Sequence, residues 1–354
     1  MTSSTAKYVS LVIVVGVVLI AGIFVLSDGE YSAIPGSPPV VEHAVIEQEQ
    51  QDRIWVDQTF EPVALREPLQ ESLIYPLILK LYDENLYVAD HGDMKVKRFS
   101  LDGKLLNVIG EGIGEGPGEF GNITDFYVRD EEIWVVSMRT RSISKFSIDG
   151  AFRSRFTVSP AALRITGLGE NLVLMMMGSS ELFHEVDTTG QVLKTFGGLV
   201  TEQTGNFLAL QGNILTTEQG GFIYVPHYAG YLYYFDRQGA LAKVLQTVDR
   251  LPFPGIESKK TDTGFAFRAP DVDIITTAGN ISDGILYVHV YFKGKTREEG
   301  FSILDRYDSK KGTYISSSRL PFPVIDAQVY KKKLYCLSDT TVTVFRLEES
   351  HRER

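Results

Sequence analysis

Six copies of one short pattern recur along most of this chain, and this repeat constrains the fold more than any other feature. The segment from Leu86 reads LYVAD and is followed by VKRFSLDGKLLNVIG, and the segment from Ile133 reads IWVVS and is followed by ISKFSIDGAFRSRFTV. Weaker copies begin at Leu172, Phe222, Ile285 and Leu334. Self-similarity of this kind is the signature of repeat architectures, so the repeat has to be explained before anything else.

Each copy contains four short strand-like runs. An apolar run such as Leu77–Leu81 precedes LYVAD, which is followed by a run of period two that ends at an apolar, mostly aromatic, residue and by a last run after a turn. Asp102-Gly103 and Asp149-Gly150 favour tight hairpins because both residue types tolerate positive φ. The residues before the turns are Phe99, Phe146, Val186, Phe235, Tyr307 and Phe345, spaced by roughly 40 to 50 residues and once by about 70.

Four strands in that length are typical of one β-propeller blade. The 17 Tyr and 20 Phe residues fit this interpretation, because aromatic side chains pack well on pleated sheets. The sequence therefore predicts an all-β fold, a six-bladed β-propeller of four-stranded antiparallel blades over residues 52–347, followed by a polar tail at 348–354.

The sixth copy is unfinished, since it ends at TVTVFRLEES without a turn or a fourth strand. A ring of blades closes best when one blade is built from both ends of the chain. The strand-like run Ile54–Leu65 is therefore expected to supply the outermost strand of the last blade.

The N-terminal segment Tyr8–Leu26 has 19 residues without a charge. As a helix it would cover roughly 28 Å, enough to span a bilayer. Lys7 precedes this segment and Asp28 follows it, so residues 1–7 are predicted to be cytoplasmic and the propeller extracytoplasmic, in the periplasm or at the cell surface. Residues 27–51, which include Pro35, are interpreted as an extended tether.

A cleaved signal peptide is the alternative for this segment. Such peptides have a shorter apolar region and a cleavage site flanked by small residues, whereas Tyr31 occupies the −3 position before Ala33. Either interpretation exports the rest of the chain.

The charge of the chain excludes one class of partner. The formal net charge is -10 and the pI is near 5.2, whereas proteins that bind phosphate backbones cluster Lys and Arg. No nucleic-acid partner is therefore expected. The single cysteine, Cys336, excludes an intramolecular disulfide.

The glycine-rich stretch GEGIGEGPGEF carries a resemblance to a known family. Together with LYVAD, it resembles the NHL-repeat and related six-bladed propellers, whose signature G-x-G-x-G-P-G-x-F corresponds here to Gly112, Gly114, Gly116, Pro117, Gly118 and Phe120. The chain is also similar to anchored or exported six-bladed propeller proteins of Bacteroidota. The resemblance covers about residues 52–347 and implies the fold, but a fold alone does not imply a function.

One face of the ring is the candidate binding surface. In an up-and-down blade, the loop that follows the second strand and the loop that leads to the next blade emerge on the same face. The insertion Val248–Asp271 is such an inter-blade connection and is expected over this face. The predicted ligand-binding residues are His91, Met138, Arg139, Arg141, Met177, His227, Tyr228, Tyr231, Tyr291 and Asp339 from second-strand loops, and Glu119 and Phe120 from inter-blade loops. The inter-blade loops also carry Glu115 and Arg164 on this face.

The predicted function is a membrane-anchored extracytoplasmic module that binds a protein, a peptide or a glycan through this face, without a cofactor and without catalysis. The alternative is a metal-dependent lyase, lactonase or hydrolase at the ring axis. Resemblance to the peptide-amidating propeller lyases implies zinc at His91 and His227, and calcium would need oxygen ligands such as Glu119, Asn122 and Asp125.

Overall fold

The computed structural model describes residues 32–34, 44–65, 69, 72–200, 208–261, 264–268, 272–294 and 299–347. The predicted anchor at 8–26 and the polar tail at 348–354 lie outside these residues. Within the described ranges, no helix has both the length and the apolar character needed to cross a bilayer.

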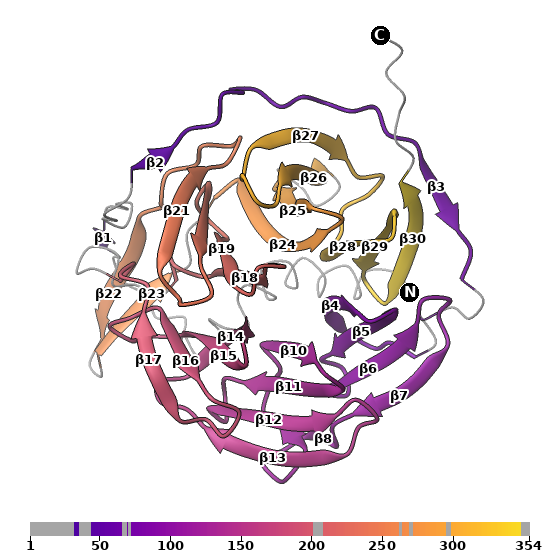
Figure 1. Cartoon of the computed structure of the whole chain (residues 1–354), viewed down its shortest axis with the longest axis vertical. Coiled ribbons are helices and arrows are strands. Elements are labelled where there is room, and N and C mark those ends of the chain that lie inside the picture. Colours follow the sequence, from indigo (N-terminus) through magenta and orange to yellow (C-terminus); the bar gives the residue numbers. More distant parts are fainter. Residues whose placement is uncertain are drawn as a thin grey trace.

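Six sheets surround a central axis and form a propeller, which confirms the predicted fold (Figure 1). The first blade contains β4 (Pro76–Tyr82), β5 (Asn85–Asp90), β6 (Lys95–Ser100) and β7 (Leu105–Ile109). The second contains β10 (Asp125–Arg129), β11 (Glu132–Ser137), β12 (Ser142–Ser147) and β13 (Phe152–Thr157), and the third contains β14 (Ala162–Leu168), β15 (Asn171–Met176), β16 (Phe183–Val186) and β17 (Val192–Phe196).

The other three blades complete the ring. The fourth contains β18 (Gly212–Thr216), β19 (Phe222–Pro226), β20 (Tyr231–Phe235) and β21 (Leu241–Gln246), and the fifth contains β24 (Ile274–Ser282), β25 (Ile285–Phe292), β26 (Phe301–Asp308) and β27 (Tyr314–Arg319). The sixth contains β28 (Asp326–Tyr330), β29 (Lys333–Ser338), β30 (Thr341–Leu347) and, from the other end of the chain, β3 (Phe60–Val63). The unfinished sixth copy is thus completed from the run Ile54–Leu65.

The repeat in the sequence corresponds to one fixed register. The residue before each turn pairs near the start of the second strand in all six blades, as in Leu86 with Phe99 and Leu334 with Phe345. It pairs with the first apolar residue of that strand in five blades and with the second, Leu286, in the fifth. In the first five blades the register shifts immediately before this residue, which places a bulge ahead of the hairpin turn.

Apolar side chains fill the spaces between neighbouring blades. Each of the six blade junctions has its own buried cluster, because alternate residues of a strand face opposite sides of its sheet. Between the third and fourth blades, for example, the ring of Phe183 meets that of Phe222 edge-on at 5.1 Å. The core is therefore a set of inter-blade layers around the axis.

The N-terminal segment 44–63, here termed the strap, runs along the outer rim of three blades (Figure 1). Its strand β2 (Val45–Ile46) pairs in parallel with β21 of the fourth blade, Trp55 bridges to Ser317 of β27 in the fifth, and β3 pairs with β30 in the sixth. The end of the segment interpreted as a tether is therefore fixed to the propeller. Gln48 holds it there by donating to the carbonyls of Gln246 and Gly312, each at 2.9 Å.

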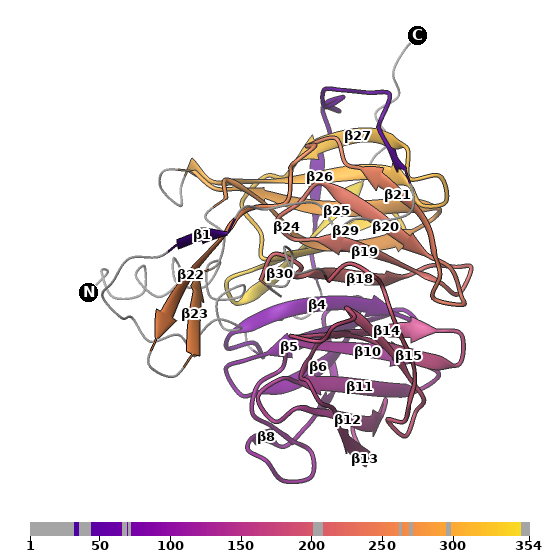
Figure 2. The same ribbon diagram turned by 90° about the vertical axis from the view of Figure 1, so that its left-hand side faces the viewer.

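The insertion after the fourth blade forms a hairpin of β22 (Ile256–Thr261) and β23 (Gly264–Arg268). Strand β1 (Ser32–Ile34) pairs with β22, so a third strand joins this hairpin. The small sheet stands out from one side of the ring (Figure 2). Because the insertion connects two blades, it leaves the ring on the face that carries the inter-blade loops.

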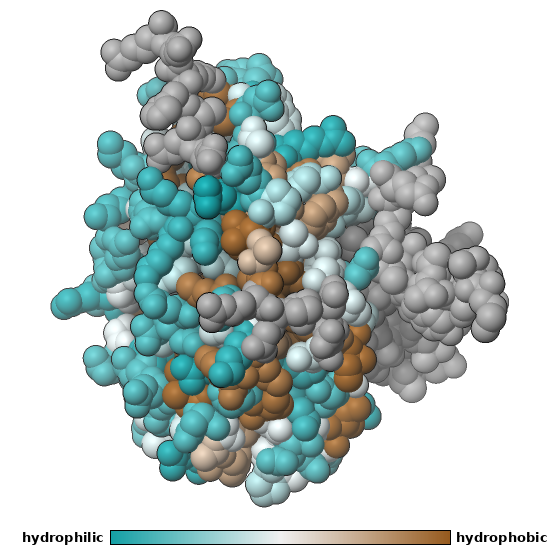
Figure 3. All heavy atoms as spheres, turned by 90° about the vertical axis from the view of Figure 1, so that its right-hand side faces the viewer, coloured by the Kyte–Doolittle hydropathy of each residue, from teal (hydrophilic) through white to brown (hydrophobic). Residues whose placement is uncertain are grey.

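The rim of the first three blades exposes apolar side chains. Leu105, Leu106 and Val108 of β7 are exposed, as are Phe152 of β13 and Val192 of β17. Figure 3 shows part of this rim, where apolar patches interrupt a mostly hydrophilic surface. These are outermost strands of their blades, and the described part of the strap does not cover them.

Candidate functional site: an axial cavity

The register places one residue of each innermost strand at an equivalent position around the axis. Each pairs with the corresponding residue of its second strand, as Asp125 does with Val136 and Arg164 with Met175. The six equivalent residues are Ile78, Asp125, Arg164, Asn213, Ala278 and Asp326. Four of the six are polar or charged, so the axis of the ring is hydrophilic at this level.

A cavity of about 920 Å³ lies on the axis and is lined by all six of these residues. Second-strand loops contribute His91, Met138 and Met177 to its wall, and inter-blade loops contribute Gly121 and Ala161. The cavity therefore lies toward the face on which both sets of loops emerge. Its volume is in the range of small-molecule sites in proteins.

Polar contacts in the wall connect each blade to the next. Asp326 of the sixth blade accepts a hydrogen bond from the amide of Leu79 at 2.9 Å, and Asn213 of the fourth donates to the carbonyl of Thr277 at 3.1 Å. Next to the wall, between the fifth and sixth blades, Asn280 donates to the carbonyl of Val329 and accepts from its amide. The wall is consequently held in place by contacts that exist only when the ring is closed.

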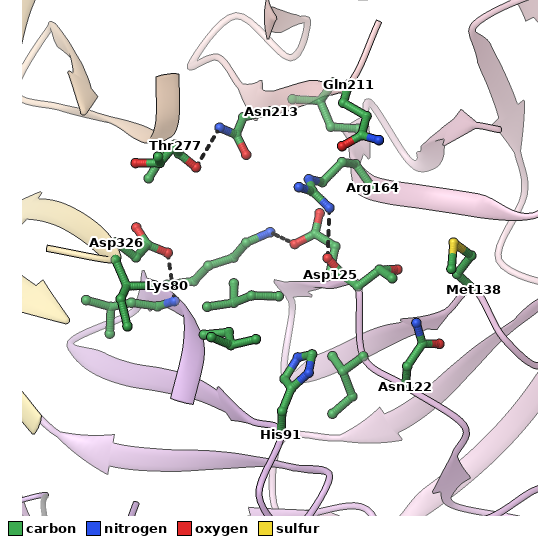
Figure 4. A pocket seen from close by; sticks show the side chains of 18 of the residues that line it. Lys80, His91, Asn122, Asp125, Met138, Arg164, Gln211, Asn213, Thr277 and Asp326 are labelled. Carbon is green, nitrogen blue, oxygen red and sulfur yellow. Dashed lines mark hydrogen bonds and ion pairs between the residues drawn. The ribbon is translucent and has the colours of Figure 1, made fainter. Parts of the chain in front are cut away.

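Arg164 and the buried His227 form a connected part of this wall (Figure 4 shows Arg164). The guanidinium of Arg164 donates to the carbonyl of Thr124 at 2.9 Å and, through its other terminal nitrogen, to Nε2 of His227 at 3.2 Å. Nδ1 of His227 faces the carbonyl of Thr276. Because arginine can only donate, His227 is the neutral tautomer with its proton on Nδ1. Burial and the nearby guanidinium lower the pKa of His227 to about 3.

Lys80 and Asp125 pair across the first and second blades at 2.6 Å (Figure 4). Asp125 also accepts a hydrogen bond from the amide of Ile165 at 3.0 Å, so one carboxylate contacts three blades. Asp326 is different, because burial raises the pKa of its carboxyl to about 6 despite the hydrogen bond from Leu79.

Four polar groups of the wall remain without partners in the described structure. Both amide atoms of Gln211 are buried and unpaired, as is Nε2 of His91, whose other ring nitrogen donates to the carbonyl of Ile123. The exposed guanidinium groups of Arg139 and Arg141 make no hydrogen bond or ion pair with any described residue. A buried donor or acceptor without a partner is costly, so Gln211 and His91 mark where a bound molecule would gain the most.

Apolar side chains form the rest of the lining. Met94, Met138 and Met177 come from three successive second-strand loops, and Ile113 projects from the first inter-blade loop with 69% of its surface exposed. Methionine adapts its shape to different ligands, because its side chain is unbranched and polarizable.

The structure brings six of the twelve predicted ligand-binding residues to the cavity. These are His91, Met138, Arg139, Arg141, Met177 and His227. The other six lie elsewhere, and four of these are buried in packing or strand positions: Phe120, Tyr228, Tyr231 and Tyr291. Asp339 is an exposed residue of the last hairpin turn, and Glu119 folds back to accept a hydrogen bond from the amide of Gly116 at 2.7 Å.

Three of the residues considered for metal binding, His227, Asp125 and Asn122, are engaged in other contacts, whereas Nε2 of His91 has no partner among the described residues. Nε2 of His227 accepts from Arg164, and Asp125 pairs with Lys80. Asn122 accepts from the amide of Arg139 at 2.8 Å. Among the described residues, no three His, Cys, Asp or Glu side chains are grouped so that they could hold a metal ion.

The glycine-rich stretch forms the loop from the first blade to the second. Its two short strands, β8 (Gly112–Ile113) and β9 (Glu119–Phe120), pair in parallel. Gly110 has φ +96°, and a Cβ atom there would lie 2.4 Å from the ring of Phe120. The glycines therefore serve a tight turn and close packing.

Sequence reasoning missed Lys80, Gln211, Asn213 and Asp326 as parts of the site. Lys80 was visible as a charge inside the apolar run Leu77–Leu81, which is unusual for a strand next to a core. The other three have no distinctive pattern around them. Their common position appears only when the register of all six blades is known.

Comparison with known proteins supports the fold. A family model described as a 6-bladed beta-propeller, DUF5128, matches residues 70–247, while a search of curated proteins gives no match. Among solved structures, an exported protein from Bacteroides fragilis is 11% identical with a TM-score of 0.54, covering 86% of this chain and 99% of its own.

Two further solved structures extend this comparison. A DUF4221 family member from Bacteroides vulgatus is 10% identical with a TM-score of 0.53, covering 84% of this chain and 99% of its own. Virginiamycin B lyase from Staphylococcus aureus is 11% identical with a TM-score of 0.48, covering 83% of this chain and 100% of its own. At such identities the likeness concerns the fold alone.

Proposed function

The chain belongs to the six-bladed β-propeller family DUF5128, and from that premise we propose that it is an extracytoplasmic binding protein whose ligand occupies the axial cavity. The ligand is a small molecule or the end of a peptide, protein segment or glycan, because a cavity of about 920 Å³ suits a compact group better than a flat protein surface.

The observation that carries this proposal is the unpaired amide of Gln211. This side chain is only 2% exposed, lines the cavity, and leaves both its donor and its acceptor unused in the described structure. A buried polar group without a hydrogen-bond partner destabilises the folded protein by about 1–3 kcal/mol. A ligand with complementary polar atoms would recover that free energy.

The contacts between blades in the wall support binding over catalysis. Lys80, Asp125, Arg164 and His227 are engaged in contacts between blades, so their first role is to keep the ring closed and the cavity shaped. A binding site needs such a rigid wall, because rigidity lowers the entropic cost of binding.

A cavity-filling variant tests the proposal. The purified full chain and its Met177→Trp variant are screened by ligand-observed NMR against a fragment library of carboxylates, amines and neutral sugars. Met177 lines the cavity and is partly exposed, so Trp fills space without entering the core. Leu193→Trp, on the exposed rim strand β17, is the matched control.

We expect fragments that bind the wild type and Leu193→Trp to lose binding to Met177→Trp. Fragments that bind all three proteins equally would place the binding site elsewhere and refute the proposal. A library from which no fragment binds the wild type would refute it as well.

The location is part of the proposal, with Tyr8–Leu26 as the membrane anchor. The single cysteine, Cys336, is fully buried, so an exposed cysteine introduced by Thr195→Cys is the only one expected to react. A membrane-impermeant maleimide should label this variant in intact cells, and the labelled protein should sediment with membranes. Labelling only after lysis would contradict the proposed location.

A further inference from the structure

The charges of the cavity wall do not balance. Four cationic side chains line the cavity, Lys80, Arg139, Arg141 and Arg164, against the two carboxylates of Asp125 and Asp326. The histidines of the wall add no positive charge at neutral pH, because burial lowers the pKa of His91 to about 4 and that of His227 to about 3. The cavity is thus positive within a chain whose net charge is -10.

The positive charge available to a ligand is concentrated on Arg139 and Arg141. Lys80 is neutralised by Asp125, and Arg164 is committed to Thr124 and His227. Arg139 and Arg141 instead lie in the turn between β11 and β12 and are exposed, and their guanidinium groups have no bonded partner among the described residues. Two guanidinium groups without partners at the edge of a cavity favour a carboxylate.

Arg139 is held in position by its surroundings. Its amide donates to Oδ1 of Asn122 at 2.8 Å, and a Cβ atom at Gly121 would lie 3.2 Å from its Cδ. The stem of Arg139 thus lies against the backbone of Gly121, where any larger residue would have to displace it. An arginine that is already positioned loses less side-chain entropy when it binds an anion.

The two buried unpaired groups, Nε2 of His91 and the amide of Gln211, would each form hydrogen bonds with polar atoms of a ligand. Because the other ring nitrogen of His91 donates to Ile123, its Nε2 is an acceptor and needs a donor from the ligand. Gln211 offers both a donor and an acceptor, as a peptide group does, and it lies across the cavity from His91 (Figure 4). Met138 and Met177, which also line the cavity, supply an adaptable apolar surface.

We propose that the cavity binds the C-terminal end of a peptide whose last side chain is apolar. The α-carboxylate binds at Arg139 and Arg141, a peptide N–H donates to His91, a peptide group pairs with Gln211, and the side chain packs on the methionines. This inference rests on the proposed function and specifies the class of its ligand. A free N-acyl amino acid has the same chemistry, so the experiment separates the two sources.

The test compares matched probes by ligand-observed NMR titration of the purified full chain. N-acetyl-leucine presents the carboxylate, the N–H and the apolar side chain; N-acetyl-leucinamide removes only the charge; and 4-methylpentanoate removes only the amide. The peptide Gly-Gly-Ala-Leu and its C-terminal amide repeat the first comparison on a longer chain. We expect binding of both free acids, with affinity at least about tenfold lower for each amide, because a charge-assisted hydrogen bond is stronger than a neutral one.

Protein variants locate the effect. The double variant Arg139→Gln, Arg141→Gln should bind the acids as weakly as the wild type binds the amides, and it should bind the amides unchanged. Gln211→Leu should weaken all peptide-like probes and leave 4-methylpentanoate unaffected. Arg153→Gln, an exposed arginine on β13 away from the cavity lining, is the control and should change nothing.

The outcomes separate this inference from the proposed function. If acids and amides bind equally well and Met177→Trp abolishes both, the cavity binds ligands but the carboxylate inference is wrong. If N-acetyl-leucine binds and the peptide does not, the ligand is a free acyl amino acid and the peptide inference is overturned. If the probes bind and Met177→Trp has no effect, both proposals fail.

Discussion

The guanidinium of Arg164 donates a hydrogen bond of 3.2 Å to Nε2 of His227 and thereby joins the third blade to the fourth beside the axis. His227 in turn donates a hydrogen bond from Nδ1 to the carbonyl of Thr276 in the fifth blade. A single neutral imidazole thus links three blades, and its protonation would remove the acceptor that Arg164 uses.

This arrangement predicts a loss of stability in acid. The pKa of His227 is about 3 in the folded protein and about 6.5 in the unfolded chain, so the unfolded state binds more protons between these values and stability falls as the pH falls through this window. In His227→Gln, which keeps a donor and an acceptor, the fall in unfolding free energy from pH 7.5 to pH 4.5 should be smaller by about 2–3 kcal/mol. Urea denaturation at both pH values measures this difference; an unchanged fall would contradict the assigned protonation state.

Asp326 predicts a dependence of the opposite sign. Burial raises the pKa of its carboxyl to about 6, so the folded state binds more protons than the unfolded state between about pH 4 and pH 6 and this group's contribution decreases as the pH rises. Relative to the wild type, Asp326→Asn should therefore gain about 2–3 kcal/mol of unfolding free energy between pH 4.5 and pH 7.5. Parallel denaturation curves for the two proteins at both pH values would show this, and a relative loss would refute it.

Lys80 and Asp125 should be strongly coupled. The carboxylate of Asp125 is buried whereas Lys80 is partly exposed, so Lys80→Met leaves an unpaired buried charge and should cost about 3 kcal/mol. Asp125→Asn should cost less, and the double variant should cost less than the sum of the two. A double-mutant cycle in urea measures the coupling, and additive losses would show that the pair contributes nothing.

Arg53 should determine how firmly the strap is attached. Its guanidinium bonds to Asp305 at 2.9 Å and to Asp249 at 2.7 Å, and the Asp305 side chain is almost fully buried. Arg53→Met leaves two carboxylates together without a cation and should destabilise the protein by about 3–5 kcal/mol. The strap should then become sensitive to limited proteolysis before the blades do. Arg153→Met on the exposed face of β13 is the control, and equal losses from both variants would contradict this role.

The glycine-rich loop should respond to substitution at one position far more than at another. Gly110→Ala combines φ +96° with a Cβ atom 2.4 Å from the Phe120 ring, so it should cost about 2–4 kcal/mol. Gly169→Ala is the matched control, because Gly169 also has positive φ but no heavy atom lies within 4 Å of a Cβ there; it should cost about 1 kcal/mol. Thermal denaturation compares the stability of the two variants. Similar losses of stability would mean that the Phe120 ring moves away from the added methyl group without an energetic cost.

The sequence was sufficient to predict the blades because the information that defines them is local. Each copy carries its own four runs and its turn residues, so Phe99 and Phe345 could be recognised as equivalent before their pairing with Leu86 and Leu334 was known. The missing strand of the sixth copy indicated that Ile54–Leu65 closes the ring for the same reason. A strand without a partner in its own hairpin has to find one elsewhere, because its backbone groups need hydrogen bonds.

The site depended on contacts between blades, and no local pattern encodes those. His91 and Met138 could be placed on the correct face from loop order alone, yet Tyr231 and Tyr291, chosen by the same reasoning, are buried in packing. Whether a loop residue turns toward the axis or into a core depends on the twist and packing of neighbouring sheets. Lys80 and Asp125 meet only because two innermost strands, 45 positions apart in the sequence, lie side by side.

By itself the sequence therefore determined the number of blades, their strands and the way the ring is closed, because these follow from hydrogen bonding and side-chain alternation within each repeat. Only the tertiary structure decided which residues form the axial wall, which of them are neutralised by neighbours, and which are left without a partner. Those properties arise when six innermost strands converge, since the distances and the burial that set charge and hydrogen bonding exist only in the closed ring.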